Sequence, residues 1–245
     1  MESQRRQQYL DAIGIDLWVP RAAPQAAAPA VVPPAAPAAP AAADTADTGD
    51  TAARWEALRT EVLGCTRCPL HLTRTQGVLG VGPRRCDWLV IGEAPGAEED
   101  RRGEPFVGAA GQLLDAMLRA IGLDRASNVY IANVLKSRPP GNRDPKPEEV
   151  SACLPYLTRQ IELLQPKIML AVGRIAAQNL LATDAPLGRL RGQVHRFGAT
   201  PLVVTYHPAY LLRTPADKRK AWEDLKFART VYQQLQAAAT DGHRP

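Results

Sequence analysis

Aromatic side chains and cysteines are scarce in this chain. Its 245 residues include four tryptophans, six tyrosines, three phenylalanines and four cysteines. No run approaches the roughly 20 apolar residues that a membrane helix needs, and the N-terminus lacks an apolar core followed by a small-residue cleavage site. We therefore expect a cytoplasmic protein without a membrane span. In that reducing compartment a C-x-x-C pair indicates a metal, cluster or redox site rather than a structural disulfide.

Large apolar side chains are also almost absent from residues 19–53, which consist mainly of Ala, Pro, Asp and Thr. Such a segment cannot bury enough surface to offset the entropy lost on ordering, so we expect a disordered Ala/Pro-rich linker. The linker separates a short helical peptide, residues 1–18, from a folded domain at residues 54–238, and a flexible tail follows at residues 239–245. The peptide either docks on a protein partner or folds back on the domain.

Positive charge is distributed unevenly. The formal charge is +5 overall, but residues 1–53 are net acidic, so the folded domain is more basic than the total indicates. A basic domain suggests a polyanionic partner such as nucleic acid, although charge alone is equally compatible with a merely soluble basic surface.

The folded domain alternates helical and strand patterns. Helices are expected at residues 54–65, 107–123, 148–164, 174–182 and 217–237, and apolar strands at residues 87–93, 128–135, 167–173 and 202–208. Short apolar runs separated by helices are typical of a buried parallel sheet. The pattern predicts an α/β fold, a three-layer α/β/α sandwich whose central, mainly parallel sheet has about four strands.

In such a sheet the ligand crevice lies beyond the carboxyl ends of the strands. The segments expected there are GEAPGAEEDRRGEPFVG (92–108), NVLKSRPPGNRDP (133–145) and HPAYLLR (207–213). The glycines of the first segment allow backbone N–H groups to approach a ligand, but they equally suit a tight turn. Asn133 carries an amide that can pair with a planar heterocycle, and His207 precedes a proline that fixes its backbone. Considered alone, each is more often a structural residue.

The end of the third segment, AYLLR, is unusual for a loop. It places Tyr210, Leu211 and Leu212 beside Arg213 where we expect surface exposure. A bulky apolar tip next to a cation suits a wedge that enters a base stack while holding phosphate. The alternative is that this segment begins the last helix and packs into the core.

Taken together and in this order, the motifs resemble those of the family 4 uracil-DNA glycosylases, the iron-sulfur type within the uracil-DNA glycosylase superfamily. They are GEAPGAEEDRRGEPFVGAAGQLL, YIANVLKSRPPGNRDP and HPAYLLR, with CTRC upstream. The resemblance implies a DNA-repair hydrolase that acts on uracil-containing DNA. It would flip uracil out and hydrolyse the N-glycosidic bond, leaving an abasic site, without a metal in the chemistry.

The resemblance also implies roles for individual residues. Phe106 would stack on the extruded uracil, and Asn133 would accept from N3–H and donate to O4. His207 would donate to O2 as charge builds on the leaving base.

Other implied roles concern the pocket wall and the DNA. Gly92, Glu93 and Ala94 would form the wall, with Glu93 a candidate general base, and Glu99 would help exclude the methyl group of thymine. Contact with DNA is implied for Arg138, Arg143, Tyr210, Leu211 and Arg213.

Family members hold a [4Fe–4S] cluster on four cysteines. Cys65, Cys68 and Cys153 match three of them, but Ser137 stands at the remaining position. Ser137 or another non-thiolate ligand could complete a weakened cluster, because these irons prefer thiolate. Alternatively, Cys86 substitutes, or the cluster is lost and the thiols are structural or bind zinc. We expect a retained cluster on three thiolates that orders the neighbouring DNA-contacting loop.

Two functions of other classes compete with the hydrolase. One is a non-catalytic nucleic-acid-binding module on the same fold, which the joint presence of Phe106, Asn133 and His207 disfavours. The other is an iron-sulfur electron carrier, which the missing cysteine disfavours. We expect a monomer in each case.

Overall fold

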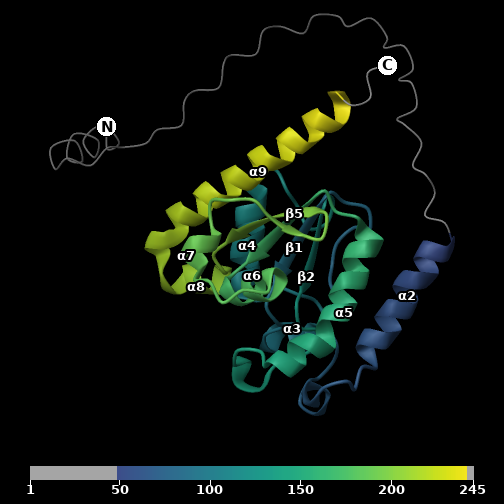
Figure 1. Ribbon diagram of the computed structural model, residues 1–245. Coiled ribbons are helices and arrows are strands. Elements are labelled where there is room, and N and C mark those ends of the chain that lie inside the picture. Colours follow the sequence, from purple (N-terminus) through teal and green to yellow (C-terminus); the bar gives the residue numbers. More distant parts are fainter. Residues whose placement is uncertain (1–48, 242–245) are drawn as a thin grey trace, which may run out of the picture. The chain divides into compact units, whose positions relative to one another are not determined.

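The computed structural model describes residues 49–241 (Figure 1). The predicted peptide at residues 1–18 and most of the predicted linker lie outside the described residues. Within the described range, no helix is both long and apolar enough to cross a membrane.

Five strands form one sheet in the order β2-β1-β3-β5-β4. Four of them are parallel, β1 (Trp88–Gly92), β2 (Val129–Asn133), β3 (Ile168–Val172) and β5 (Thr200–Thr205). The fifth, β4 (His195–Phe197), pairs antiparallel with β5 at the sheet edge. The predicted parallel sheet is confirmed, and β4 is an addition to it. Its three residues are only partly buried and carry no apolar run, so the local pattern held no strand signal.

Alternate side chains of the strands enter two separate apolar clusters. In β1, Leu89 and Ile91 pack on one face of the sheet, whereas Trp88 and Val90 pack on the other. This period of two is what a sheet covered on both faces requires. The sandwich therefore has helices on both faces, as predicted.

The helices divide between the two faces according to these clusters. The first face carries α2 (Gly49–Leu63), α5 (Pro147–Leu164), α6 (Arg174–Leu181) and α7 (Leu187–Leu190). The second carries α4 (Ala109–Arg119), α8 (Pro208–Arg213) and α9 (Lys218–Asp241). In Figure 1 the strands lie between α5 and α9. The remaining helices are short, α3 (Ala97–Arg102), η1 (Pro69–Leu72), η2 (Pro140–Asn142) and η3 (Pro215–Asp217).

Three predicted boundaries were wrong. Helix α2 begins at Gly49, so residues 49–53, predicted as linker, are helical; Ala52 and Ala53 favour helix, and Asp50 suits its first turn. Helix α9 continues to Asp241, into the predicted tail. The segment HPAYLLR is not a loop, because residues 208–213 form α8 with Pro208 at its first position.

Candidate active site

A pocket of about 430 Å³ lies beyond the carboxyl ends of β1, β2 and β5. It brings together most of the residues that the sequence predicted for substrate and DNA. The predicted residues that line it are Glu93, Ala94, Glu99, Phe106, Asn133, Arg143, His207, Tyr210 and Arg213. The strand ends thus gather side chains that are more than a hundred positions apart in the chain.

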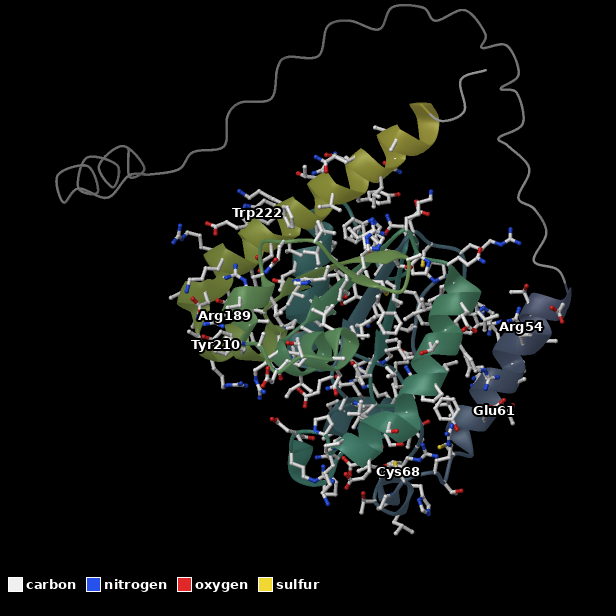
Figure 2. All side chains as sticks on the ribbon, in the orientation of Figure 1. Arg54, Glu61, Cys68, Arg189, Tyr210 and Trp222 are labelled. Carbon is white, nitrogen blue, oxygen red and sulfur yellow. The ribbon has the colours of Figure 1, made fainter. Side chains whose placement is uncertain are left out.

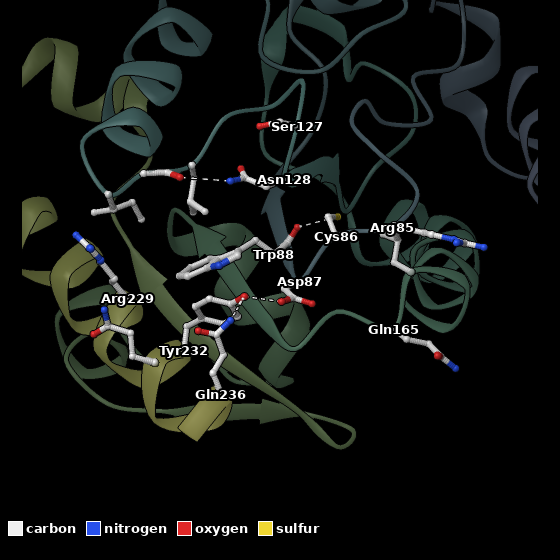
Figure 3. A pocket seen from close by; sticks show the side chains of 15 residues that line it. Arg85, Cys86, Asp87, Trp88, Ser127, Asn128, Gln165, Arg229, Tyr232 and Gln236 are labelled. Atoms are coloured by element: carbon white, nitrogen blue, oxygen red, sulfur yellow. Dashed lines mark hydrogen bonds between the residues drawn. The ribbon is translucent and has the colours of Figure 1, made fainter. Parts of the chain in front are cut away.

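A larger cavity, of about 720 Å³, lies at the opposite edge of the sheet and is lined by none of these residues (Figure 3). Its polar groups are largely paired with one another. Asp87 accepts from Tyr232 and forms an ion pair with Lys167. We therefore place the candidate active site in the smaller pocket, where the predicted residues converge.

Asn133 ends β2 at the floor of the pocket, directly opposite Gly92 in the sheet register. Its side chain is buried, and its Oδ1 has no hydrogen-bond partner among the described residues. A buried acceptor without a partner is costly, so such an atom indicates a ligand donor. Gly92 is required beside it, because a Cβ there would lie 2.4 Å from Asn133 Oδ1 and 2.5 Å from the Phe106 ring.

Phe106 holds a strained conformation, with φ of 53°. Arg125 fixes it by donating to the carbonyl oxygens of Pro105 at 3.2 Å and Phe106 at 2.8 Å. Gly111 lets the backbone come close, because a Cβ there would lie 1.8 Å from the Phe106 carbonyl oxygen. The ring faces His207 across 5.7 Å between ring centroids, tilted by 32°. Backbone strain of this kind at a pocket wall indicates a fixed platform for a planar ligand.

Glu99 organises the loop between β1 and α4. One carboxylate oxygen accepts from the backbone N–H groups of Val107 at 2.9 Å and Gly108 at 3.1 Å, and the other accepts from Gly96 at 3.1 Å. These bonds tie both ends of the loop that carries Phe106. Glu99 lines the pocket, but three backbone donors already engage its carboxylate.

His207 caps the N-terminus of α8 through its Nδ1, which accepts from the backbone N–H of Ala209 at 3.1 Å. Burial lowers the pKa of His207 to about 4, with Arg213 acting in the same direction and Glu99 opposing. The ring is therefore neutral near physiological pH, and the Nδ1 bond assigns its single proton to Nε2. Gly173, with φ of 98°, makes room for the ring, since its Cβ would lie 2.9 Å from His207 Cβ.

Glu93 follows β1 on the pocket wall. Burial raises the pKa of Glu93 to about 7, the Asp144 carboxylate adds to the rise, and Arg174 opposes it. Asp144 lines the same pocket and forms an ion pair with Arg174 at 3.1 Å. A carboxyl group that exchanges its proton near neutral pH is suited to acid–base work.

The residues predicted to contact DNA differ in availability. Arg143 makes a bidentate ion pair with the buried Glu149, at 2.5 and 2.9 Å, and Arg138 donates to Asn142. Arg213 is exposed at the pocket rim. The Tyr210 hydroxyl donates to Asp217 at 2.6 Å.

Leu211 does not lie where the wedge interpretation requires. It is 1% exposed and belongs to the core beneath α8, whereas its neighbour Leu212 is 44% exposed. Successive helical side chains point in different directions, so only one of the two leucines can face outward. The outward side chain is Leu212.

Three of the four cysteines gather near the segment after β2. Cys153, on α5, packs with Leu70 and Leu135, and Cys68 packs against the same cluster. Burial raises the pKa of the Cys153 thiol, and Cys68 and Cys65 are close enough to add to this rise. Cys86 instead lines the cavity at the opposite edge of the sheet, so it does not substitute for a missing ligand.

Ser137 lies beside these thiols, buried to 4% exposure. Its hydroxyl accepts from Arg74 at 2.8 Å. Within residues 49–241, no group of three or more His, Cys, Asp or Glu side chains is arranged to hold a single metal ion. A cubane cluster binds each ligand through a different iron, so it does not need thiols that converge on one point. The three thiols fit such a group, and the fourth position offers a hydroxyl already paired with a guanidinium.

Several residues that shape the pocket were not predicted. Lys136 is buried and donates to the Asn133 carbonyl oxygen at 2.7 Å and to Gln160 at 2.5 Å, which fixes the strand end. Gly111 and Gly173 were seen only as helix and turn glycines. Asp144 had a weak signal, as an acid within a loop otherwise rich in Arg and Pro.

Together, the fold and the pocket define an α/β protein with a buried amide that suits a planar ring, and comparison places it in the uracil DNA glycosylase superfamily, whose profile matches residues 79–226. The type-4 uracil-DNA glycosylase of Archaeoglobus fulgidus is 47% identical over 68% of this chain and 87% of that protein. Those of Pyrobaculum aerophilum and Sulfurisphaera tokodaii are 43% and 40% identical, over 69% and 72% of this chain and 90% and 84% of those proteins. The chain belongs to the type-4 uracil-DNA glycosylase family.

Proposed function

We propose that this protein excises uracil from DNA by hydrolysing the bond between the base and the deoxyribose, as a step of DNA repair. The observation that carries the proposal is the unpartnered, buried Oδ1 of Asn133 at the floor of a pocket walled by Phe106 and His207. Uracil is planar and presents an N–H at N3 flanked by carbonyl oxygens. It therefore offers the donor that this oxygen lacks.

Base selection follows from the Asn133 amide. With Oδ1 accepting from uracil N3–H, the amide nitrogen donates to O4. Cytosine presents an acceptor at N3 and a donor at N4, so both contacts would be mismatched inside a buried site. Phe106 supplies the stacking surface for the extruded base, and stacking of this kind contributes about 1 to 3 kcal/mol per base.

His207 stabilises the leaving base. The C1′–N1 bond breaks with its electron pair passing to the uracil, and the charge spreads to O2. The neutral ring of His207 donates from Nε2 to that oxygen. Because the donor is neutral in the resting protein, it interacts more strongly with the developing anion than with neutral uracil, which is the condition for catalysis.

Glu93 takes the proton of the attacking water. The water oxygen forms the new bond to C1′, and its proton passes to the carboxylate on the pocket wall. A pKa of about 7 leaves a substantial carboxylate fraction at neutral pH. Glu99 supports the same pocket by fixing the loop of Phe106 and crowding the space that a thymine methyl would need.

Entry of the base requires flipping from the stack. Leu212 and Tyr210, on α8, are suited to fill the space that the base leaves, while Arg213 and Arg138 contact phosphate. Arg143 contributes through the order that its ion pair with Glu149 gives to the same loop.

Cys65, Cys68 and Cys153 are proposed to hold a [4Fe–4S] cluster, with Ser137 at the fourth corner. The cluster supplies structural order to the segment after β2 and no step of the hydrolysis. Residues 1–18, outside the described residues, are proposed as a docking peptide for a protein partner. A pull-down that loses no partner when they are deleted would count against the second proposal.

Uracil release tests the function directly. The protein should release uracil from an oligonucleotide with one deoxyuridine and leave matched thymine and cytosine oligonucleotides intact. His207→Ala should slow release by about 10² to 10³-fold, the usual effect of losing one preorganised donor, while DNA binding changes little. Equal loss of release and binding would contradict the catalytic role, and no release by the unchanged protein would leave a binding module.

A further inference from the structure

A basic surface continues outward from the pocket over three helices. We call it the α7–α9 surface; its cations are Arg189, Arg191, Arg213, Lys218, Arg219 and Lys220. Figure 2 shows Arg189 and Tyr210 at the same end of the domain. Tyr210 and Arg213 also line the pocket, so the surface and the active site are continuous.

The framework of this surface is rigid. Arg191 forms a bidentate ion pair with the buried Asp224, at 2.7 and 2.9 Å, and lies over the Tyr206 ring at 4.4 Å. It also donates to the Lys220 carbonyl oxygen at 2.8 Å, which links the end of α7 to the first turn of α9. Tyr206 stacks on Tyr210, with 5.4 Å between ring centroids, which joins α8 to the same unit.

The acids of this region are already engaged. Asp224 is 3% exposed and satisfied by Arg191. Asp217 accepts from Tyr210 and pairs with Lys220 at 2.9 Å. By contrast, Arg189 and Lys218 are exposed and have no ion-pair partner among the described residues. The outward charge of the surface is therefore positive.

The first turn of α9 carries its cations where a helix least favours them. Lys218, Arg219 and Lys220 are consecutive, and that turn contains no acid. The N-terminal end of a helix has a partial positive charge, so cations there lower the stability of the helix and anions raise it. Such a cluster suits a surface that meets an external polyanion.

We propose that the α7–α9 surface binds the backbone phosphates of the DNA strand beyond the flipped nucleotide, extending the DNA contact past the pocket rim. The inference rests on the proposed function, because continuity with the uracil pocket identifies the polyanion as DNA. Arg189, Lys218 and Arg219 supply long, exposed cationic side chains at positions that a trinucleotide seated in the pocket does not reach. Affinity for DNA then increases with strand length through these residues.

The experiment compares two substrates and two variants. The test variant is R189Q/K218Q/R219Q; the control, R54Q/R59Q/R229Q, removes the same charge from exposed positions on α2 and on the far part of α9. Substrates are a uracil trinucleotide and a single strand of roughly 30 nucleotides with one central uracil, both assayed across a salt series because phosphate binding is salt-dependent.

For the long strand, the test variant should bind about 10- to 10³-fold more weakly at low salt, and its slope of log K against log salt should be shallower by about 0.7 for each phosphate that is no longer neutralised. For the trinucleotide, kcat/KM should stay within about twofold, and the control variant should keep most of the long-strand affinity. Melting temperatures should match that of the unchanged protein, since the three side chains are exposed. K218Q/R219Q alone provides a milder variant.

Unchanged affinity for the long strand, or an equal loss with the trinucleotide or in the control variant, would overturn the proposal. Failure of the proposed function gives a different pattern, in which the unchanged protein releases uracil from neither substrate. Binding of the long strand by the two variants still tests the surface in that case.

Discussion

Arg74 donates a hydrogen bond to the hydroxyl of Ser137 at 2.8 Å, at the position where the family carries a cysteine. The same guanidinium donates to the carbonyl oxygens of Val62, Leu63 and Cys65, at 3.2, 2.7 and 3.0 Å. Arg74 thus joins the end of α2 and the first cysteine to the segment after β2. These are also the segments that a cluster would bridge, so protein hydrogen bonds already hold the site together.

Changing Ser137 to Cys should strengthen iron binding. A fourth thiolate restores the preferred ligand set, so iron and acid-labile sulfide should rise toward about four of each per chain, with slower loss in air. Anaerobic purification followed by iron and sulfide analysis measures this, with Ser137→Ala as the matched control. Absence of iron from the unchanged protein and from Ser137→Cys alike would show that the three thiols no longer hold a cluster.

Changing Arg74 to Met should lower the free energy of unfolding by about 2 to 3 kcal/mol, because a charged donor is lost from several part-buried carbonyl oxygens. Chemical denaturation measures the change. Arg59→Met, on the exposed face of α2, is the control and should change stability by less than about 0.5 kcal/mol. Equal stability of the two variants would mean that Arg74 is not the tie between these segments.

Changing Asn133 to Ala should lower kcat/KM for uracil excision by about 10²-fold or more, because both hydrogen bonds to the base edge are removed. The fold should persist, since Asn133 Oδ1 makes no hydrogen bond to the described protein. Single-turnover excision and a melting curve separate the two effects. Unimpaired excision would remove the basis for base reading by this amide.

Changing Gly92 to Ala should block the pocket, because the added Cβ meets both Asn133 and Phe106. We expect kcat/KM to fall by about 10²-fold and stability to fall by about 1 to 3 kcal/mol, as for other overpacked sites. Gly188→Ala is the control, since a Cβ there meets nothing within 4 Å. Excision that survives in Gly92→Ala would show that uracil does not lie against this strand.

The rate of excision should depend on pH through Glu93. If its carboxylate accepts the proton from water, kcat/KM rises with pH and levels above the pKa of about 7. Asp144→Asn removes a carboxylate that raises this pKa, so the rising limb should move to lower pH. Glu93→Gln should abolish the limb. His207, with a pKa of about 4, should contribute no change near neutral pH. A limb that persists in Glu93→Gln would assign it to another group.

The two leucines of α8 should behave oppositely. Leu211→Ala should lower the free energy of unfolding by about 2 to 5 kcal/mol, because it opens a cavity in the core. Leu212→Ala should change stability by less than about 0.5 kcal/mol but slow excision from duplex DNA more than from single strands, where no base pair opposes flipping. The reverse assignment would mean that α8 turns over when DNA binds.

Local sequence determined the architecture of the domain. Apolar runs such as WLVIG and IMLAV are long enough to cross a sheet and too uniformly apolar to tolerate water on either face, so the parallel strands and their order with the helices were predictable. The motifs after those strands placed Asn133, Phe106 and His207 at one edge. Segments without such a signal were misjudged, as with β4 and the first turn of α2.

Only the tertiary structure decided the state of each side chain, because that state depends on partners distant in the chain. The bond from Ala209 to Nδ1 and the surrounding burial set the tautomer and charge of His207, and α8 buries Leu211 while exposing Leu212. Sequence showed that Ser137 departs from the cysteine pattern. That Arg74, sixty-three positions earlier, holds its hydroxyl follows only from packing, since hydrogen bonds between remote segments leave no local pattern in either one.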